Sequence, residues 1–163
     1  EAGLELSPRG GIKVNVLMMT SDPDIFAVGD AVEVRDFVTG LPTMTALAGP
    51  ANKQGRIAAD NAMGRRSIFK GALGTSVVKV FDMTVAATGA NEKTLRKHAI
   101  PHMVSYTHSG SHASYYPGAR MMAVKLVFSP ANVHSVIQSI GAPSRYLRSP
   151  HNLILHKFCF HSA

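Results

Sequence analysis

The sequence predicts an α/β segment that passes into an α+β domain, and three observations predict it. A short apolar run at residues 25–28 stops at a Gly-Asp pair, as a buried strand delivering a carboxylate at its C-terminal end would. A helical pattern opens at Gly49-Pro50 and continues to about Ala62. Residues 75–128 then follow the order strand, helix, strand, strand, which suits a sheet with a helix on one face.

The remaining elements of the first half are short. Residues 10–16 predict a strand entered through a glycine turn, and the polar residues 32–42 predict a loop. Proline is favoured at the first helical position, where its missing N–H would be unpaired anyway, and Gly64 is a suitable C-terminal stop. The basic, glycine-containing residues 65–74 are the candidate domain boundary.

The second half predicts longer strands. The β-branched residues 75–86 predict one long strand, and residues 92–98 predict a helix that Asn91 can cap. Two further strands are expected, at residues 102–106 and 121–128, while residues 133–140 suit either a strand or a short helix.

Composition limits the class of protein. An apolar fraction of 45% argues against disorder, and no run of eighteen apolar residues predicts a membrane span. A single cysteine, Cys159, excludes an internal disulfide framework and favours a reducing, cytoplasmic location. The net charge of +7 raises the question of nucleic acid, but the basic residues are dispersed and form no such motif, so no nucleic-acid partner is expected.

Two places offer candidate binding groups. Asp30 either caps the following turn or accepts hydrogen bonds from a sugar hydroxyl, with Gly29 allowing close approach of the backbone. The helix that starts near residue 49 either packs on its sheet or offers its N-terminal N–H groups to a ligand carrying negative charge. Small residues form a stripe along it that would permit close approach to a sheet or a flat ligand: Ala51, Gly55, Ala58 and Ala62.

These segments together resemble the pyridine nucleotide-disulfide oxidoreductases. The resemblance rests on Asp24-Ile-Phe-Ala-Val-Gly-Asp-Ala31 followed by Leu47-Ala-Gly-Pro-Ala-Asn-Lys-Gln-Gly-Arg56. It continues through residues 74–82, 87–89 and 112–119, and within the family it is closest to the coenzyme A-disulfide reductase and NADH oxidase branch.

The resemblance implies a C-terminal fragment with three parts. Residues 1–66 would be the end of an FAD-binding domain, 70–128 a partial dimerisation domain, and 129–163 an atypical tail for which a shifted reading frame is one hypothesis. It further implies that Asp30, beside Gly29, binds the flavin ribitol, and that backbone N–H groups near Leu47, Ala48 and Gly49 face the flavin pyrimidine edge.

The resemblance also implies a homodimer whose partner subunit completes the active site. Tyr115 and Tyr116 would then lie near the disulfide substrate of the other subunit, where a hydroxyl could bind a thiolate or a pantetheine arm. The alternative is that the two tyrosines alternate across a strand, one buried and one on the surface.

The implied activity is reduction of a disulfide such as coenzyme A disulfide, with NAD(P)H as co-substrate. No Gly-x-Gly-x-x-Gly motif is present and no redox cysteine is expected, so the sequence predicts no catalytic residue here and no turnover by the fragment alone. Alternatives are an NADH oxidase or peroxidase acting on oxygen species, or a dimerisation module without a redox role. His108 and His112 stand four apart, but the glycine and serines between them argue against a metal site.

Overall fold

The computed structural model describes residues 2–130 and 137–143, and the chain divides into two compact units. Unit 1 is Glu1–Gly74 and unit 2 is Thr75–Ala163.

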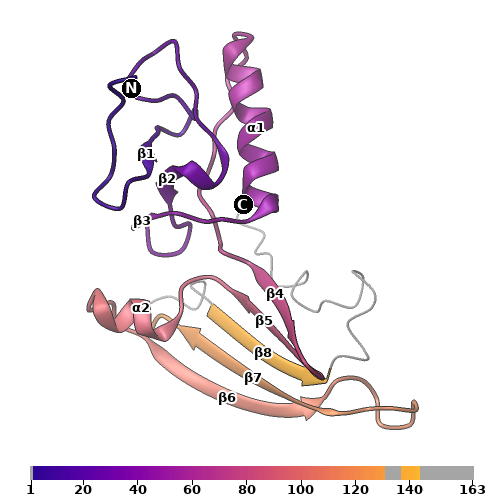
Figure 1. Ribbon diagram of the computed structural model, residues 1–163. Coiled ribbons are helices and arrows are strands. Elements are labelled where there is room, and N and C mark those ends of the chain that lie inside the picture. The colour runs from indigo at the N-terminus through magenta and orange to yellow at the C-terminus, as the bar shows by residue number, and fades with distance from the viewer. Residues whose placement is uncertain (1, 131–136, 144–163) are drawn as a thin grey trace. The chain divides into compact units, whose positions relative to one another are not determined.

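Unit 1 contains a small mixed sheet and one long helix. The strands are β1 (Ile12–Lys13), β2 (Val32–Arg35) and β3 (Pro42–Thr43), with β2 in the centre, parallel to β1 and antiparallel to β3. Helix α1 (Ala48–Ala62) runs beside this sheet, and the single 3-10 turn η1 (Gly29–Ala31) precedes β2 (Figure 1).

The core of unit 1 joins β2 to α1. Val32 and Val34 point to the same side of β2 and are buried, while Arg35 is exposed, as period-two alternation requires. From α1, Ile57 packs into the same cluster, and the rest of it comes from loops: Met18, Phe69 and Ala72. This burial therefore fixes the face of α1 that lies against the sheet.

Two predictions for unit 1 are wrong. Residues 25–28 do not form a buried strand: they are half-buried or exposed, and Phe26 makes one isolated antiparallel bridge to Met19. The strand lies instead within residues 32–42, which were predicted to be a loop. Gly29, with φ of +83°, turns the chain before Asp30, so the regular strand begins only after η1.

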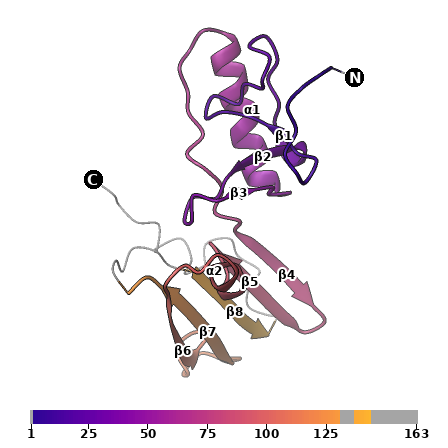
Figure 2. The same cartoon turned by 90° about the vertical axis from the view of Figure 1, so that its left-hand side faces the viewer.

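The described residues of unit 2, 75–130 and 137–143, form a five-stranded antiparallel sheet and one short helix. Its strands are β4 (Ser76–Val80), β5 (Met83–Thr88), β6 (Met103–Gly110), β7 (Met121–Phe128) and β8 (Ile137–Pro143). They pair in the order β4-β5-β8-β7-β6, so the last strand lies between β5 and β7. Helix α2 (Glu92–Lys97) lies on one face of the sheet (Figure 2).

In unit 2 one predicted strand is wrong and another is confirmed in part. Residues 75–86 are not one long strand but a hairpin, because the two residues between Val80 and Met83 turn the chain and Phe81 takes a positive φ of 51°. Of the two readings of residues 133–140, the strand is confirmed for the part within β8. The rest of the tail lies outside the described residues.

Both predicted helices are confirmed. Pro50 is the third residue of α1, still within the first turn, and Gly64 ends the helix with a φ of +76°. The Asn91 side chain caps α2 by accepting the Thr94 N–H at 2.9 Å. In the described part of the chain, no helix is long and apolar enough to cross a membrane.

Candidate functional site

The start of α1 presents backbone donors to solvent. Leu47 is the N-cap, and its own N–H already donates to the Thr45 carbonyl at 3.0 Å. The N–H groups of Ala48 and Gly49 have no acceptor among the described residues, and both residues are exposed. No acidic residue occupies the first turn, so no carboxylate of α1 itself offsets the partial positive charge at this end.

The η1 turn presents a carboxylate next to this helix. Asp30 is exposed and makes no hydrogen bond or ion pair with another described residue. A Cβ at Gly29 or at Gly49 would meet no atom within 4 Å, so each of the two residues has open space on the side where a side chain would stand. An unpaired carboxylate, two unpaired N–H groups and open backbone fit a ligand with hydroxyls and a polar ring edge.

Gln54 links η1 to α1, and the sequence patterns did not point to this residue. Its side chain is only 2% exposed, and its Oε1 accepts the Gly29 N–H at 2.7 Å. The η1 turn packs against α1 in this way although Gly29 and Gln54 are 25 residues apart. The available signal was the spacing of Gln54 to Ile57, which places the amide on the buried face of the helix.

The two tyrosines lie in the connection between β6 and β7. Tyr115 is 81% and Tyr116 60% exposed, and their ring centroids are 4.8 Å apart with planes tilted by 40°. Both side chains are on the surface of a turn, so the alternative in which one is buried within a strand is wrong. Their apolar rings are available to a ligand or to another subunit.

Among the described residues, no group of three His, Cys, Asp or Glu side chains could hold a metal ion. His108 lies on β6, and its partner in the i, i+4 spacing, His112, lies beyond the strand. Cys159 lies outside the described residues.

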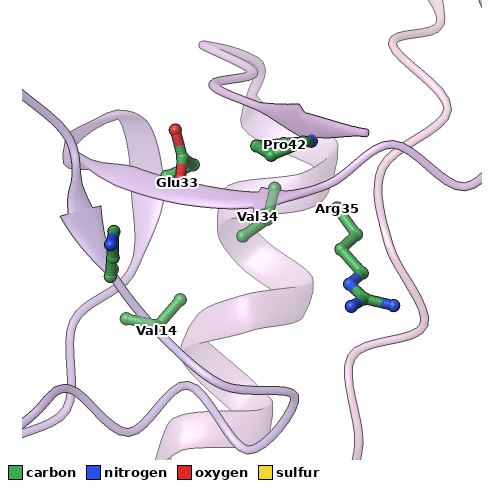
Figure 3. Close-up of a pocket in the computed structure, with 6 residues that line it drawn as sticks. Val14, Glu33, Val34, Arg35 and Pro42 are labelled. Carbon is green, nitrogen blue, oxygen red and sulfur yellow. The ribbon is translucent and has the colours of Figure 1, made fainter. Parts of the chain in front are cut away.

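A small hollow in unit 1 is a separate feature. Its volume is ≈ 190 Å³ and it is lined by Lys13 together with the residues labelled in Figure 3: Val14, Glu33, Val34, Arg35 and Pro42. Lys13 donates to Glu5 at 2.6 Å, and this hydrogen bond raises its pKa. The hollow is too small for a dinucleotide and does not include η1 or the start of α1.

A charge cluster connects α2 to the sheet of unit 2. Glu92 pairs with Lys125 of β7 and with Arg96 one turn along α2, while Nε2 of His102 lies 3.9 Å from its carboxylate. The hydrogen bond from Lys125 lowers the pKa of Glu92, and the same bond raises the pKa of Lys125. This cluster is consistent with a structural tie between helix and strand.

Comparison with known proteins identifies the family, although no family model matches the chain. A coenzyme A disulfide reductase of Staphylococcus haemolyticus is 35% identical over 134 residues, which are 82% of this chain and 30% of that protein. An NADH oxidase of Methanocaldococcus jannaschii is 34% identical over 133 residues, which are 77% of this chain and 30% of that protein.

Two solved structures agree with these relatives. Reduced CoADR-RHD of Bacillus anthracis matches with a TM-score of 0.80 and 52% identity, over 86% of this chain and 26% of that one. A FAD-dependent pyridine nucleotide-disulphide oxidoreductase of Desulfovibrio vulgaris matches with a TM-score of 0.64 and 36% identity, over 86% and 32% of the two chains.

The chain spans about 30% of the length of the curated relatives it matches. Its two units reproduce part of the fold of the solved proteins, and the relatives carry both activities of the branch that the motifs predicted. The predicted family is confirmed: the chain belongs to the pyridine nucleotide-disulfide oxidoreductases.

Proposed function

We propose that this chain is part of a flavin-dependent NAD(P)H oxidoreductase that reduces a disulfide such as coenzyme A disulfide. The relative named coenzyme A disulfide reductase and the solved FAD-dependent protein support this assignment. When bound, FAD supplies the capacity to accept a hydride and pass its electrons on singly or in pairs. The residues of unit 1 hold and orient it.

One observation carries the cofactor proposal: an unpaired carboxylate and two unpaired N–H groups lie on elements that pack together. The Asp30 carboxylate accepts hydrogen bonds from the ribitol, and the N–H groups of Ala48 and Gly49 donate to the pyrimidine edge of the flavin. Because the Leu47 N–H is already bonded to Thr45, Leu47 contributes the N-cap geometry rather than a donor.

Unit 2 has the complementary role of dimerisation. We propose a homodimer in which Tyr115 and Tyr116 reach the disulfide substrate in the partner's site. Their exposure supports this role, as do large apolar side chains exposed on the same unit, including Phe81 at 92% and Met121 at 67%. A cytoplasmic location is part of the same proposal, since a flavin disulfide reductase works on thiols in a reducing compartment.

A second candidate is an NADH oxidase acting on oxygen species, and the Methanocaldococcus jannaschii relative favours it. Measuring NADH consumption by the whole protein with coenzyme A disulfide and, separately, with dissolved oxygen separates the two. The chain by itself is expected to show neither activity, since it contains no Gly-x-Gly-x-x-Gly loop and its one cysteine has no companion.

The cofactor proposal is tested by FAD titration of the chain, followed by nuclear magnetic resonance because the affinity of a partial site is low. Asp30→Ala should weaken FAD binding about tenfold, the effect of losing hydrogen bonds to a charged acceptor. Asp24→Ala is the matched control: an exposed aspartate on the same segment, six residues earlier, that should leave binding unchanged.

The outcomes separate the candidates. Equal weakening by both aspartate variants would indicate a loss of general charge and would contradict the assigned role of Asp30. A chain that forms a stable dimer but gives no response to millimolar FAD would favour the alternative of a dimerisation module without a redox role.

A further inference from the structure

Gln54 occupies a position where an apolar residue would be expected. It lies on the face of α1 that packs on the core, next to Ile57, and only 2% of it is exposed. Burying a primary amide is costly unless its polar atoms are bonded, whereas a Leu or Met would fill the space without that cost. The amide therefore has a role that packing alone does not explain.

That role is visible in the hydrogen bond that Gln54 makes to η1. The Gly29 N–H is the first of η1 and has no acceptor within this single turn, whose internal bond runs from the Val32 N–H to the Gly29 carbonyl. The Val28 side chain cannot cap the turn, because valine has no acceptor. Gln54 Oε1 supplies the missing acceptor at 2.7 Å.

Helix α1 transmits this constraint to its own N-terminus. From Ala48 to Gln54 the axis rises about 9 Å at roughly 1.5 Å per residue, and a hydrogen-bonded helix does not change that spacing. Fixing η1 on Gln54 thus also fixes Asp30 relative to the free N–H groups of Ala48 and Gly49.

We propose that Gln54 is a positioning residue for FAD: its buried amide holds the Gly29 turn so that Asp30 and the start of α1 engage the cofactor together. This inference rests on the proposed function, since it gives Gln54 a role through Asp30. It assigns Gln54 no contact with the cofactor.

A second buried-face amide of α1 provides the matched control. Asn61 Nδ2 donates to the carbonyls of Leu17 and Ser67 at 3.0 and 2.8 Å, and its Oδ1 accepts the Ser67 N–H at 3.0 Å. These bonds tie the opposite end of α1 and touch no part of η1. Asn61→Ala should therefore lower the melting temperature while the fully folded chain keeps its affinity for FAD.

The test compares Gln54→Met, which has similar length but no amide acceptor, with Gln54→Glu, which keeps an oxygen acceptor. Gln54→Met should speed hydrogen exchange of the Gly29 amide and weaken FAD binding by about tenfold, the value of one well-placed buried hydrogen bond. Gln54→Glu should keep the Gly29 amide protected.

A double-mutant cycle distinguishes positioning from general destabilisation. If Gln54 acts through Asp30, Gln54→Met should weaken FAD binding by less than about twofold in the Asp30→Ala background. Asp30→Ala has then already removed the contact that Gln54 positions. Full additivity, or unchanged FAD affinity in Gln54→Met, would overturn the positioning role while leaving the proposed function in place.

Wild-type measurements cover the case in which Gln54→Met does not fold. Hydrogen exchange should show the Gly29 amide protected before FAD is added, to the same degree as the amides of α1. A Gly29 amide that exchanges freely in the absence of FAD would overturn the inference. Absence of any FAD response in the wild-type chain would instead refute the proposed function, and the inference with it.

Discussion

The two units of this chain use different means to fix their backbones. In unit 1 the sheet strands are only two to four residues long, and side chains such as Asn15, Gln54 and Asn61 hold the loops by hydrogen bonds to backbone groups. In unit 2 strands of five to eight residues hold one another by regular ladders, and much apolar surface is left exposed.

This difference matches the proposed roles. A cofactor site requires irregular backbone with unpaired donors in fixed places, and specific side-chain contacts can provide that. An association surface requires a stiff platform that carries apolar groups, and a sheet provides that. A variant that weakens the stability or the association of one unit can therefore be measured with the other unit as an internal reference.

The largest effect is expected from the core of unit 2. Leu95 is 3% exposed and packs with Ala90 and Val127. Leu95→Ala should lower the free energy of unfolding of unit 2 by about 2–5 kcal/mol through lost transfer energy and a cavity. Hydrogen exchange should show faster opening of β5 amides and unchanged α1 amides.

The control for that variant is Lys93→Ala, which truncates an exposed side chain of the same helix, α2, and should change stability little. Equal acceleration of exchange in α1 and β5 after Leu95→Ala would mean that the two units unfold as one and do not fix their backbones independently.

A smaller effect is expected from the side-chain hydrogen bonds of unit 1. Asn61→Ala removes three bonds and should lower the free energy of unfolding of this unit by about 1–3 kcal/mol, because the Leu17 and Ser67 carbonyls lose their donors. Asn52→Ala, at an exposed position of the same helix, is the control. Thermal melts that do not separate the two variants would show that the Asn61 contacts contribute no net stability.

The exposed hairpin turn of unit 2 tests the association surface. Phe81→Asn removes a ring that is 92% exposed, and Asn tolerates the positive φ at this position. Self-association should weaken about tenfold, the value of burying one aromatic side chain, with the fold unchanged. Sedimentation equilibrium measures it, and identical association constants would place the dimer surface elsewhere.

The smallest effect concerns pH. The lowered pKa of Glu92 means that its pairing with Lys125 stabilises unit 2 above the ordinary carboxylate value of 4.5 and that this stability is lost as pH falls through the folded value. For Lys125, whose pKa is raised, the stability is complete below its ordinary value of 10.5 and is lost as pH rises through the folded value.

Glu92→Gln removes the largest cause of the raised pKa of Lys125, with Tyr106 the next, so the stability of unit 2 should become less dependent on pH at both ends of the range. Urea unfolding of unit 2 between pH 2 and pH 6 checks the acid limb. An unchanged slope of stability against pH in Glu92→Gln would show that other carboxylates dominate it.

Sequence patterns predicted the long elements well and the short ones poorly. Helix α1 has a proline in its first turn and a glycine stop, and all eight residues of β7 except Lys125 are apolar, so both carry strong local signals. β2 has only four residues, too few for periodicity to stand out from a loop. The β4–β5 hairpin was hidden because its turn uses Phe81 and Asp82 without the glycine that usually marks such turns.

The candidate site was predictable in part for the same reason. Asp30 and the start of α1 stand in local motifs, so sequence could point to each of them separately. Their link through Gln54 depends on which helix face is buried and on a contact 25 residues away, and neither is a local property. The commitment of the Leu47 N–H to Thr45 likewise emerges only from three-dimensional geometry.

An amide chemical-shift map of the wild-type chain during FAD titration locates the cofactor site directly. The largest shifts should fall on Ala48, Gly49 and Asp30, with β4 to β7 unaffected, and Asp30→Ala should reduce them. Shifts that concentrate on unit 2, or a complete lack of shifts at millimolar FAD, would contradict the claim that η1 and the start of α1 form the cofactor site.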